Sequence, residues 1–165
     1  MSSESETVLE SRRGPALDAL DPGPEFHELW FSLQRWQWAS LVVVPADEGG
    51  SVVRIAQSLA AVGGRLHGAA VTAFVAEALD FDSAAETAAS LAAPTSSSGP
   101  RGAAQTGQMI IAIEPVVTRP LAISIARAAD IALLCIEMGR MRLASARRTI
   151  ELVGRDRFVG CVMVT

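Results

Sequence analysis

The sequence contains no lysine, no tyrosine and no asparagine, so all 14 of its positive charges are arginines. The absence of lysine excludes the phosphate-binding lysine of a P-loop, a Schiff-base lysine and the strand lysine of a protein kinase. The absence of tyrosine excludes a tyrosine phosphate acceptor within this chain. Any function that depends on one of these groups is therefore ruled out for this chain acting alone.

Histidine is also scarce, with only His27 and His67, which lie far apart in the sequence. Neither has a cysteine or carboxylate at the spacing of a metal site, and no Gly-x-Ser-x-Gly motif is present to make a serine hydrolase. We therefore predict no catalytic residues and no metal site. The net charge of −4 argues against a general nucleic-acid binder.

The two cysteines, Cys135 and Cys161, lie in strongly apolar segments, which predicts buried free thiols in a reducing compartment. The chain has no run of about 18 uncharged apolar residues, and its start lacks the apolar core of a signal peptide. We expect a cytoplasmic protein with no membrane span, peripheral to the inner membrane only through a partner.

The length and the hydrophobic half of the composition predict one folded domain over residues 25–165. Polar residues, glycines and prolines predict a disordered tail over residues 1–24 and a flexible loop over residues 93–108. Apolar spacing predicts helices at residues 25–37, 51–62, 76–92, 119–129 and 141–153, and strands at residues 39–44, 69–75, 109–113, 131–136 and 158–164.

The predicted strands are continuous apolar runs, which indicates burial on both faces in a parallel sheet. Alternation with helices and right-handed crossovers then predict an α/β fold, a three-layer doubly wound sheet of about five strands. Ligands of such folds bind at the carboxyl ends of the strands. The loops of interest are therefore residues 45–51, 76–82, 114–120 and 137–140.

The first loop (residues 45–51) lies between a strand and a helix, where a P-loop would bind phosphate. Gly49 and Ser51 occupy the positions of its last glycine and its magnesium-binding hydroxyl, but Gly50 stands in place of the lysine. Asp47 and Glu48 add negative charge at this point. The helix N-terminus still offers free N–H groups, so weak nucleotide binding stays open, whereas ATP hydrolysis is not expected.

The chain resembles the bacterial tyrosine kinases (BY-kinases) of capsule and exopolysaccharide synthesis, which belong to the ParA- and MinD-like P-loop ATPases. The likeness covers residues 24–164. Residues 24–33, PEFHELWFSL, resemble the N-terminal helix of that family, and residues 45–60 resemble its Walker A unit. Residues 109–116, MIIAIEPV, resemble the Walker B strand, and residues 130–164 resemble the last strand–helix–strand. The resemblance implies a P-loop NTPase-like fold.

The departures from the family pattern fall on its chemistry. Ala112 replaces the Walker B aspartate, and the second strand ends at Glu77 instead of an Asp-x-Asp motif. Glu77 is either a displaced carboxylate or a solvated helix start. His27 and Trp30 replace two arginines that serve ring assembly in the family. The pattern predicts a non-catalytic, pseudokinase-like member without a bound cofactor.

Two surfaces are candidates for protein contacts. Phe26, His27, Trp30 and Phe31 lie on one predicted helix, whose Trp30 and Phe31 point about 100° apart, so the helix cannot bury all its aromatics in one direction.

The second surface is an arginine cluster around the last helix, which includes Arg140 and Arg147. It is either a solvated face or a docking patch for an acidic partner or anionic lipid headgroups.

The resemblance implies a non-catalytic protein of exopolysaccharide or capsule biosynthesis or export. It would bind the cytoplasmic end of a membrane polysaccharide co-polymerase, or self-associate as a homo-oligomer. One alternative is a ParA/MinD-like positioning or regulatory module without ATPase cycling. Another is an enzyme of a different class that uses Asp47, Glu48 and Ser51.

Overall fold

A computed structural model of the chain describes residues 22–67, 71–92 and 107–165. Within them a single sheet of five parallel strands has the order β2-β3-β1-β4-β5. The elements in chain order are α2 (Pro24–Leu33), β1 (Ser40–Pro45), α3 (Ser51–His67), β2 (Val71–Ala76), α4 (Phe81–Ala92), β3 (Gln108–Ile113), α5 (Ala122–Ala128), β4 (Ile131–Glu137), α6 (Leu143–Val153), the short 3-10 helix η2 (Arg155–Arg157) and β5 (Phe158–Val164).

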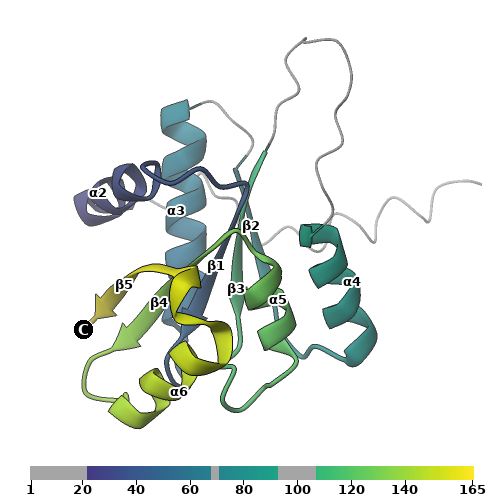
Figure 1. Cartoon of the computed structure of the whole chain (residues 1–165). Coiled ribbons are helices and arrows are strands. Elements are labelled where there is room, and N and C mark those ends of the chain that lie inside the picture. Colours follow the sequence, from purple (N-terminus) through teal and green to yellow (C-terminus); the bar gives the residue numbers. More distant parts are fainter. Residues whose placement is uncertain (1–21, 68–70, 93–106) are drawn as a thin grey trace, which may run out of the picture.

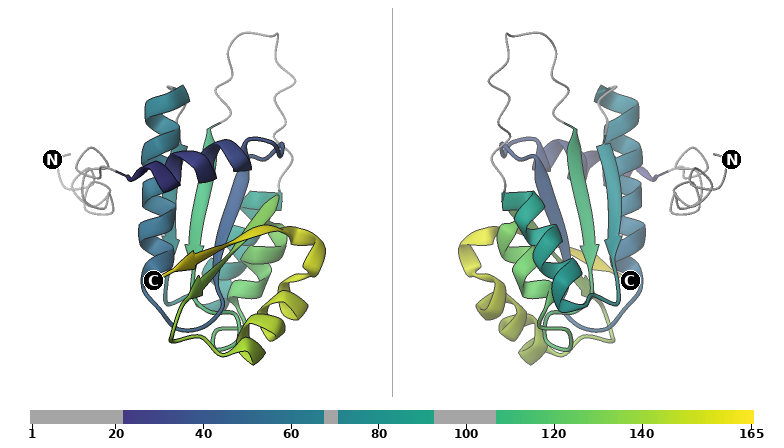
Figure 2. Two further views of the ribbon diagram at one scale, coloured as in Figure 1. Left: turned by 90° about the vertical axis from the view of Figure 1, so that its left-hand side faces the viewer. Right: turned by 90° about the vertical axis from the view of Figure 1, so that its right-hand side faces the viewer.

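Helices cover the sheet in two groups. Helices α2 and α3 lie over one face, and α4, α5 and α6 lie over the other (Figure 1 and Figure 2). The predicted three-layer, doubly wound α/β fold is therefore confirmed. In the described part of the chain, no helix is both long and apolar enough to cross a bilayer.

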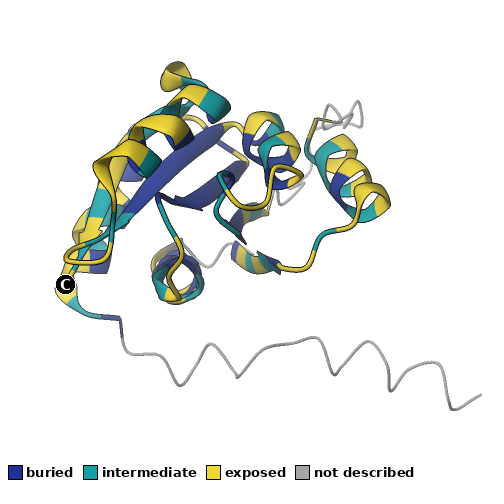
Figure 3. Cartoon of the chain, turned by 90° about the horizontal axis from the view of Figure 1, so that it is seen from below, coloured by how far each residue is buried: buried dark blue, intermediate teal, exposed yellow. Residues whose placement is uncertain are grey.

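The central strand β1 is buried along its whole length (Figure 3). Its residues pair in register with β3 on one side and β4 on the other, as in Leu41 with Ile110 and Ile131. The predicted burial on both faces holds for β1 but is wrong for the two edge strands, because β2 mixes buried and exposed residues and β5 has only half-buried and exposed ones. Edge strands have only one neighbour, and β5 also lacks a helix over part of one face.

The amino ends of β1 and β4 are held together by side chains. The Asp130 carboxylate accepts hydrogen bonds from the backbone N–H groups of Ala39 and Ser40, at 2.8 and 2.9 Å. The Ser40 hydroxyl in turn accepts one from the Asp130 N–H at 2.9 Å. This reciprocal contact fixes the relative position of the two strands, and so of the loops at their opposite, carboxyl ends.

Helix α2 packs against α3 through the indole of Trp30. A Cβ at Gly63 would collide with that ring, so the absence of a side chain lets the two helices approach closely. The sequence predicted that this helix ends at residue 62, which is wrong, because α3 continues through Gly63 and Gly64 to His67. Packing of the indole against residue 63 outweighs the poor helix propensity of glycine.

Several other boundaries differ from their predictions. The first helix begins at Pro24, within the predicted tail, and ends at Leu33 instead of residue 37. Proline suits a first helical position because its fixed φ is helical and its missing N–H has no partner there.

Helix α4 begins at Phe81 instead of residue 76, because Asp80 and Ser83 form a reciprocal cap at its start. Helices α5 and α6 are also shorter at their starts than predicted. The predicted disordered tail (residues 1–24) and flexible loop (residues 93–108) lie outside the described residues, except at residues 22–24 and 107–108, where α2 and β3 begin.

Candidate functional site

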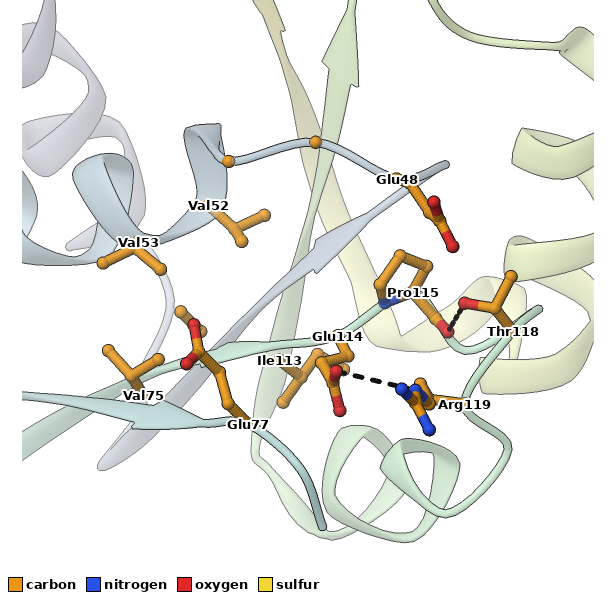
Figure 4. Close-up of a pocket in the computed structure, with 13 residues that line it drawn as sticks. Glu48, Val52, Val53, Val75, Glu77, Ile113, Glu114, Pro115, Thr118 and Arg119 are labelled. Atoms are coloured by element: carbon orange, nitrogen blue, oxygen red, sulfur yellow. Dashed lines mark hydrogen bonds and ion pairs between the residues drawn. The ribbon is translucent and has the colours of Figure 1, made fainter.

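The loops after β1, β2 and β3 meet at the carboxyl edge of the sheet, as predicted, and enclose a cleft of about 240 Å³. The start of α3 forms one wall and the loop after β3 forms another (Figure 4). The charged residues that line the cleft are Glu48, Glu77, Glu114 and Arg119. Ala112 is part of its apolar lining. The position is the one at which doubly wound folds bind ligands.

The first loop is fastened to the end of β4 by Glu137. The Ser51 N–H donates a hydrogen bond of 3.1 Å to Glu137 Oε1, and the Ser51 hydroxyl donates one of 2.5 Å to the same oxygen. Two residues before Ser51, a Cβ added at Gly49 would collide with the Glu137 carboxyl group. The carboxylate therefore lies directly against Gly49 and the first residue of α3.

This carboxylate lies at the N-terminus of α3, where it binds Ser51. The N–H groups at a helix N-terminus attract an anion, and here the anion is a side chain of the same chain. The hydrogen bond from the Ser51 hydroxyl lowers the pKa of Glu137, with further lowering from the Ser51 N–H and the charge of Arg140. Glu137 is therefore ionised at neutral pH.

The remaining charges around the first loop are mostly negative. The Glu48 N–H donates a hydrogen bond of 2.9 Å to Asp47, and this bond lowers the pKa of Asp47. Arg119, the one basic residue that lines the cleft, lies 3.6 Å from Glu114. Glu114 also accepts a hydrogen bond from the Ala78 N–H at 3.1 Å. A triphosphate at this site would face a surplus of carboxylates.

The Ser51 hydroxyl donates to the Glu137 carboxylate, so a hydroxyl and a possible base do lie side by side at the first loop. His27 lies in α2, with Nδ1 3.1 Å from the Gly23 carbonyl oxygen. The side chain of His67 is outside the described part. Within the described ranges, no three histidine, cysteine or acidic side chains lie close enough together to hold a metal ion.

The predicted aromatic interface on α2 is only partly exposed. Trp30 is 0% exposed and packs edge-to-face on Trp38, with ring centroids 5.9 Å apart, and Phe26 is also buried. The structure therefore excludes these two from a surface contact, because the α2–α3 packing places them in the core. Phe31 is 57% exposed, and His27 is half-buried.

Trp36, in the turn after α2, is 52% exposed and lies within residues 25–38, the aromatic-rich segment expected to carry the interface. Its signal was the large number of aromatics in so short a segment.

The arginine cluster and the cysteines also differ in part from expectation. Arg140 and Arg147 are both exposed, as an interface would require. Cys135 is buried, and burial raises the pKa of its thiol to about 11. Cys161 is exposed, so the prediction that both thiols are buried is wrong for it. The reason is that β5 is an edge strand.

Two further residues were not singled out from the sequence, Glu114 and Glu137. Glu114 directly follows β3 and Glu137 is the last residue of β4, and the carboxyl ends of these two neighbours of β1 lie at the same edge of the sheet. Position in the sheet was thus the available signal, although the sequence does not reveal which strands are neighbours. The chain matches no protein-family model and no curated protein sequence.

Proposed function

We propose that this chain is a non-catalytic, BY-kinase-like protein that acts through its surfaces in exopolysaccharide or capsule biosynthesis or export. The observation that carries the proposal is the Glu137 carboxylate bound at the start of α3. The site at which the resembling enzymes bind phosphate is filled from within, and the lysine and aspartate of those enzymes are absent from it.

The magnitudes support this view. A helix N-terminus contributes about 0.3–1 kcal/mol to the binding of an exposed anion. A carboxylate within about 8 Å of a phosphate opposes binding by about 2 kcal/mol per pair of unit charges, at an effective dielectric constant of about 20. Asp47, Glu48 and Glu137 lie in or against the first loop and outnumber the arginines that act on them, Arg140 and Arg142, so the net repulsion of one charge exceeds the attraction of the helix end.

The surface that binds the partner contains Phe31 and Trp36. Both are large aromatic side chains exposed at one end of the molecule, and exposed aromatics are enriched where proteins bind one another. The proposed partner is the cytoplasmic end of a membrane polysaccharide co-polymerase, with self-association as the second use of the same surface.

The first test is co-purification of the chain with the cytoplasmic end of such a co-polymerase. The Phe31→Ser, Trp36→Ser double variant should lose at least ten-fold in affinity while its melting temperature stays close to that of the wild type. Phe81→Ser is the control, because Phe81 is also an exposed aromatic residue (73%) but lies on α4, over the opposite face of the sheet. Equal loss in both variants would contradict the assigned surface.

The second test concerns catalysis and process. Neither ATP nor GTP with magnesium should raise the melting temperature, since a ligand that binds the native state must raise it. Stabilisation by several degrees would contradict the non-catalytic proposal. A deletion strain should produce altered polysaccharide. Unchanged polysaccharide, with the protein located at a pole or septum, would favour the positioning-module alternative.

A further inference from the structure

Strand β5 leaves part of one sheet face uncovered. Leu134 and Ile136 of β4 face α6, and they pair in register with Cys161 and Met163 of β5. Paired residues of neighbouring strands point to the same face. Cys161 and Met163 therefore face the α6 side, yet Met163 is 67% exposed.

This exposure is unusual for the fold. Parallel sheets are found with both faces covered, since the crossover helices lie on them. Helix α6 packs on β4 through Ala146 and Ile150 and reaches β5 only at the first residue of that strand, Phe158 (Figure 1). The place next to α6, over β5, is thus a helix position of the doubly wound architecture that no described residue of this chain fills.

An apolar groove of about 480 Å³ marks the position. Its floor is formed by Leu134, Ile136 and Phe158 from the sheet, and one wall is formed by Leu143 and Ile150 of α6. Leu143, at the start of α6, is 70% exposed at the groove. The groove therefore offers an apolar surface that the described chain leaves open to water.

Arginines line the same groove. Arg147 and Arg155 both contribute to its walls and are exposed, and neither forms an ion pair with a described residue. Residues 138–158 contain six arginines and two acidic residues, a net charge of +4 in a chain whose total is −4. Because every cation is an arginine, this charge persists at all physiological pH values.

We propose that the groove binds an acidic amphipathic helix of another protein, which lies over β5 beside α6 with its apolar side on the groove floor and its carboxylates against Arg147 and Arg155. To cover the seven residues of β5, such a helix needs about 15 residues. A second copy of the chain fits less well, because a two-fold axis at β5 would bring two copies of the same arginines together. The proposal is independent of the α2 surface and of any role in polysaccharide synthesis.

The probe is a displayed library of helical peptides of about 15 residues with random surface positions, selected on the full chain. The enriched peptides should combine an apolar stripe with a surplus of Asp and Glu. Arg147→Glu with Arg155→Glu should weaken their binding at least ten-fold. Arg35→Glu is the matched control, because Arg35 is an exposed arginine after α2, away from the groove.

Cys161 reports the location of binding. It is the exposed thiol at the groove, so a bound peptide should slow its reaction with a thiol reagent at least five-fold, whereas the buried Cys135 stays unreactive throughout. Enriched peptides without an acidic surplus, or peptides that leave Cys161 reactive, would overturn the proposal.

Other occupants give distinguishable results. Protection of Cys161 that rises with the concentration of the chain alone would indicate a second copy, and protection independent of concentration would indicate another segment of the same chain. Protection by phosphatidylglycerol vesicles but not by peptides would indicate a lipid surface. Each of these three outcomes would overturn the assignment to an acidic helix.

Discussion

Replacement of Glu137 tests the central contact of the candidate site. Glu137→Ala removes the acceptor of two hydrogen bonds, from the Ser51 N–H and the Ser51 hydroxyl. Loss of a capping acceptor at a helix N-terminus costs about 0.5–2 kcal/mol, and the Glu137 side chain is half-exposed, so we expect a loss of about 1–2 kcal/mol. For a chain of this length the melting temperature should fall by about 3–6 °C.

Glu137→Gln separates the charge from the hydrogen bonds, because the amide oxygen still accepts from Ser51. About half of the loss should remain. The pH dependence has a definite sign. The pKa of Glu137 is lowered in the folded state from its ordinary value of 4.5, so the stabilisation is fully present above that value and is lost as the pH falls through the folded pKa. The difference between wild type and Glu137→Gln should therefore be full at pH 7 and shrink in acid.

The assay is thermal unfolding between pH 3 and pH 8 (a range of about five units, which spans the carboxyl titrations), with and without phosphate. Glu48→Ala is the matched control, because it removes the same charge from the first loop and its side chain is exposed. Phosphate should stabilise Glu137→Ala more than wild type, since the start of α3 is then free. If Glu137→Ala and Glu48→Ala unfold at the same temperature and respond equally to phosphate, the argument that Glu137 fills this site is refuted.

Three further predictions concern the scaffold. Gly63→Ala should lower the free energy of unfolding, measured in urea, by about 1–3 kcal/mol, because the added Cβ has no room against the packed indole. Gly64→Ala, whose added Cβ has nothing within 4 Å, should leave the free energy of unfolding unchanged or raise it by up to about 1 kcal/mol. Equal effects of the two variants would contradict the close approach of α2 and α3. A thiol reagent at pH 8 should modify Cys161 and leave Cys135 unmodified until the chain unfolds, as mass spectrometry of the labelled peptides would show; early labelling of both would contradict the burial that raises the pKa of Cys135 to about 11. Asp130→Ala should cost about 1–3 kcal/mol, because two backbone N–H groups at the start of β1 lose their acceptor, and Asp130→Asn, which keeps a carbonyl oxygen, should recover part of this; no loss in either variant would refute the contact.

The fold class was predictable because its signal is local. Five apolar runs alternate with helical spacing, and each run is short enough to be a strand, so a parallel α/β sheet follows from general rules. The strand at residues 158–164 was predicted with its observed bounds. The end of α3 was not predictable, because the effect of Gly63 depends on an indole from another helix, at a distance that the sequence does not contain.

Only the first loop of the candidate site was predictable from the sequence. Its acidic residues and its lack of lysine can be read without knowing which strands are neighbours. The role of Glu137 depends on β1 and β4 being neighbours in the sheet and on the register that brings their ends together. The bond between Glu137 and Ser51 joins two residues that are 86 positions apart in the sequence. Likewise, Trp30 and Phe31 are consecutive residues of one helix and point in different directions. The sequence showed that the helix cannot bury both against one surface, but not which of the two is exposed.

The bond between Ser51 and Glu137 also bears on any attempt to engineer a phosphate-binding site at the start of α3. A lysine placed at Gly50 would stand beside a carboxylate that is already held by the adjacent residue, and the two charges would neutralise one another. An engineered site would therefore need changes at Gly50 and at Glu137 together, although the two residues belong to distant parts of the sequence.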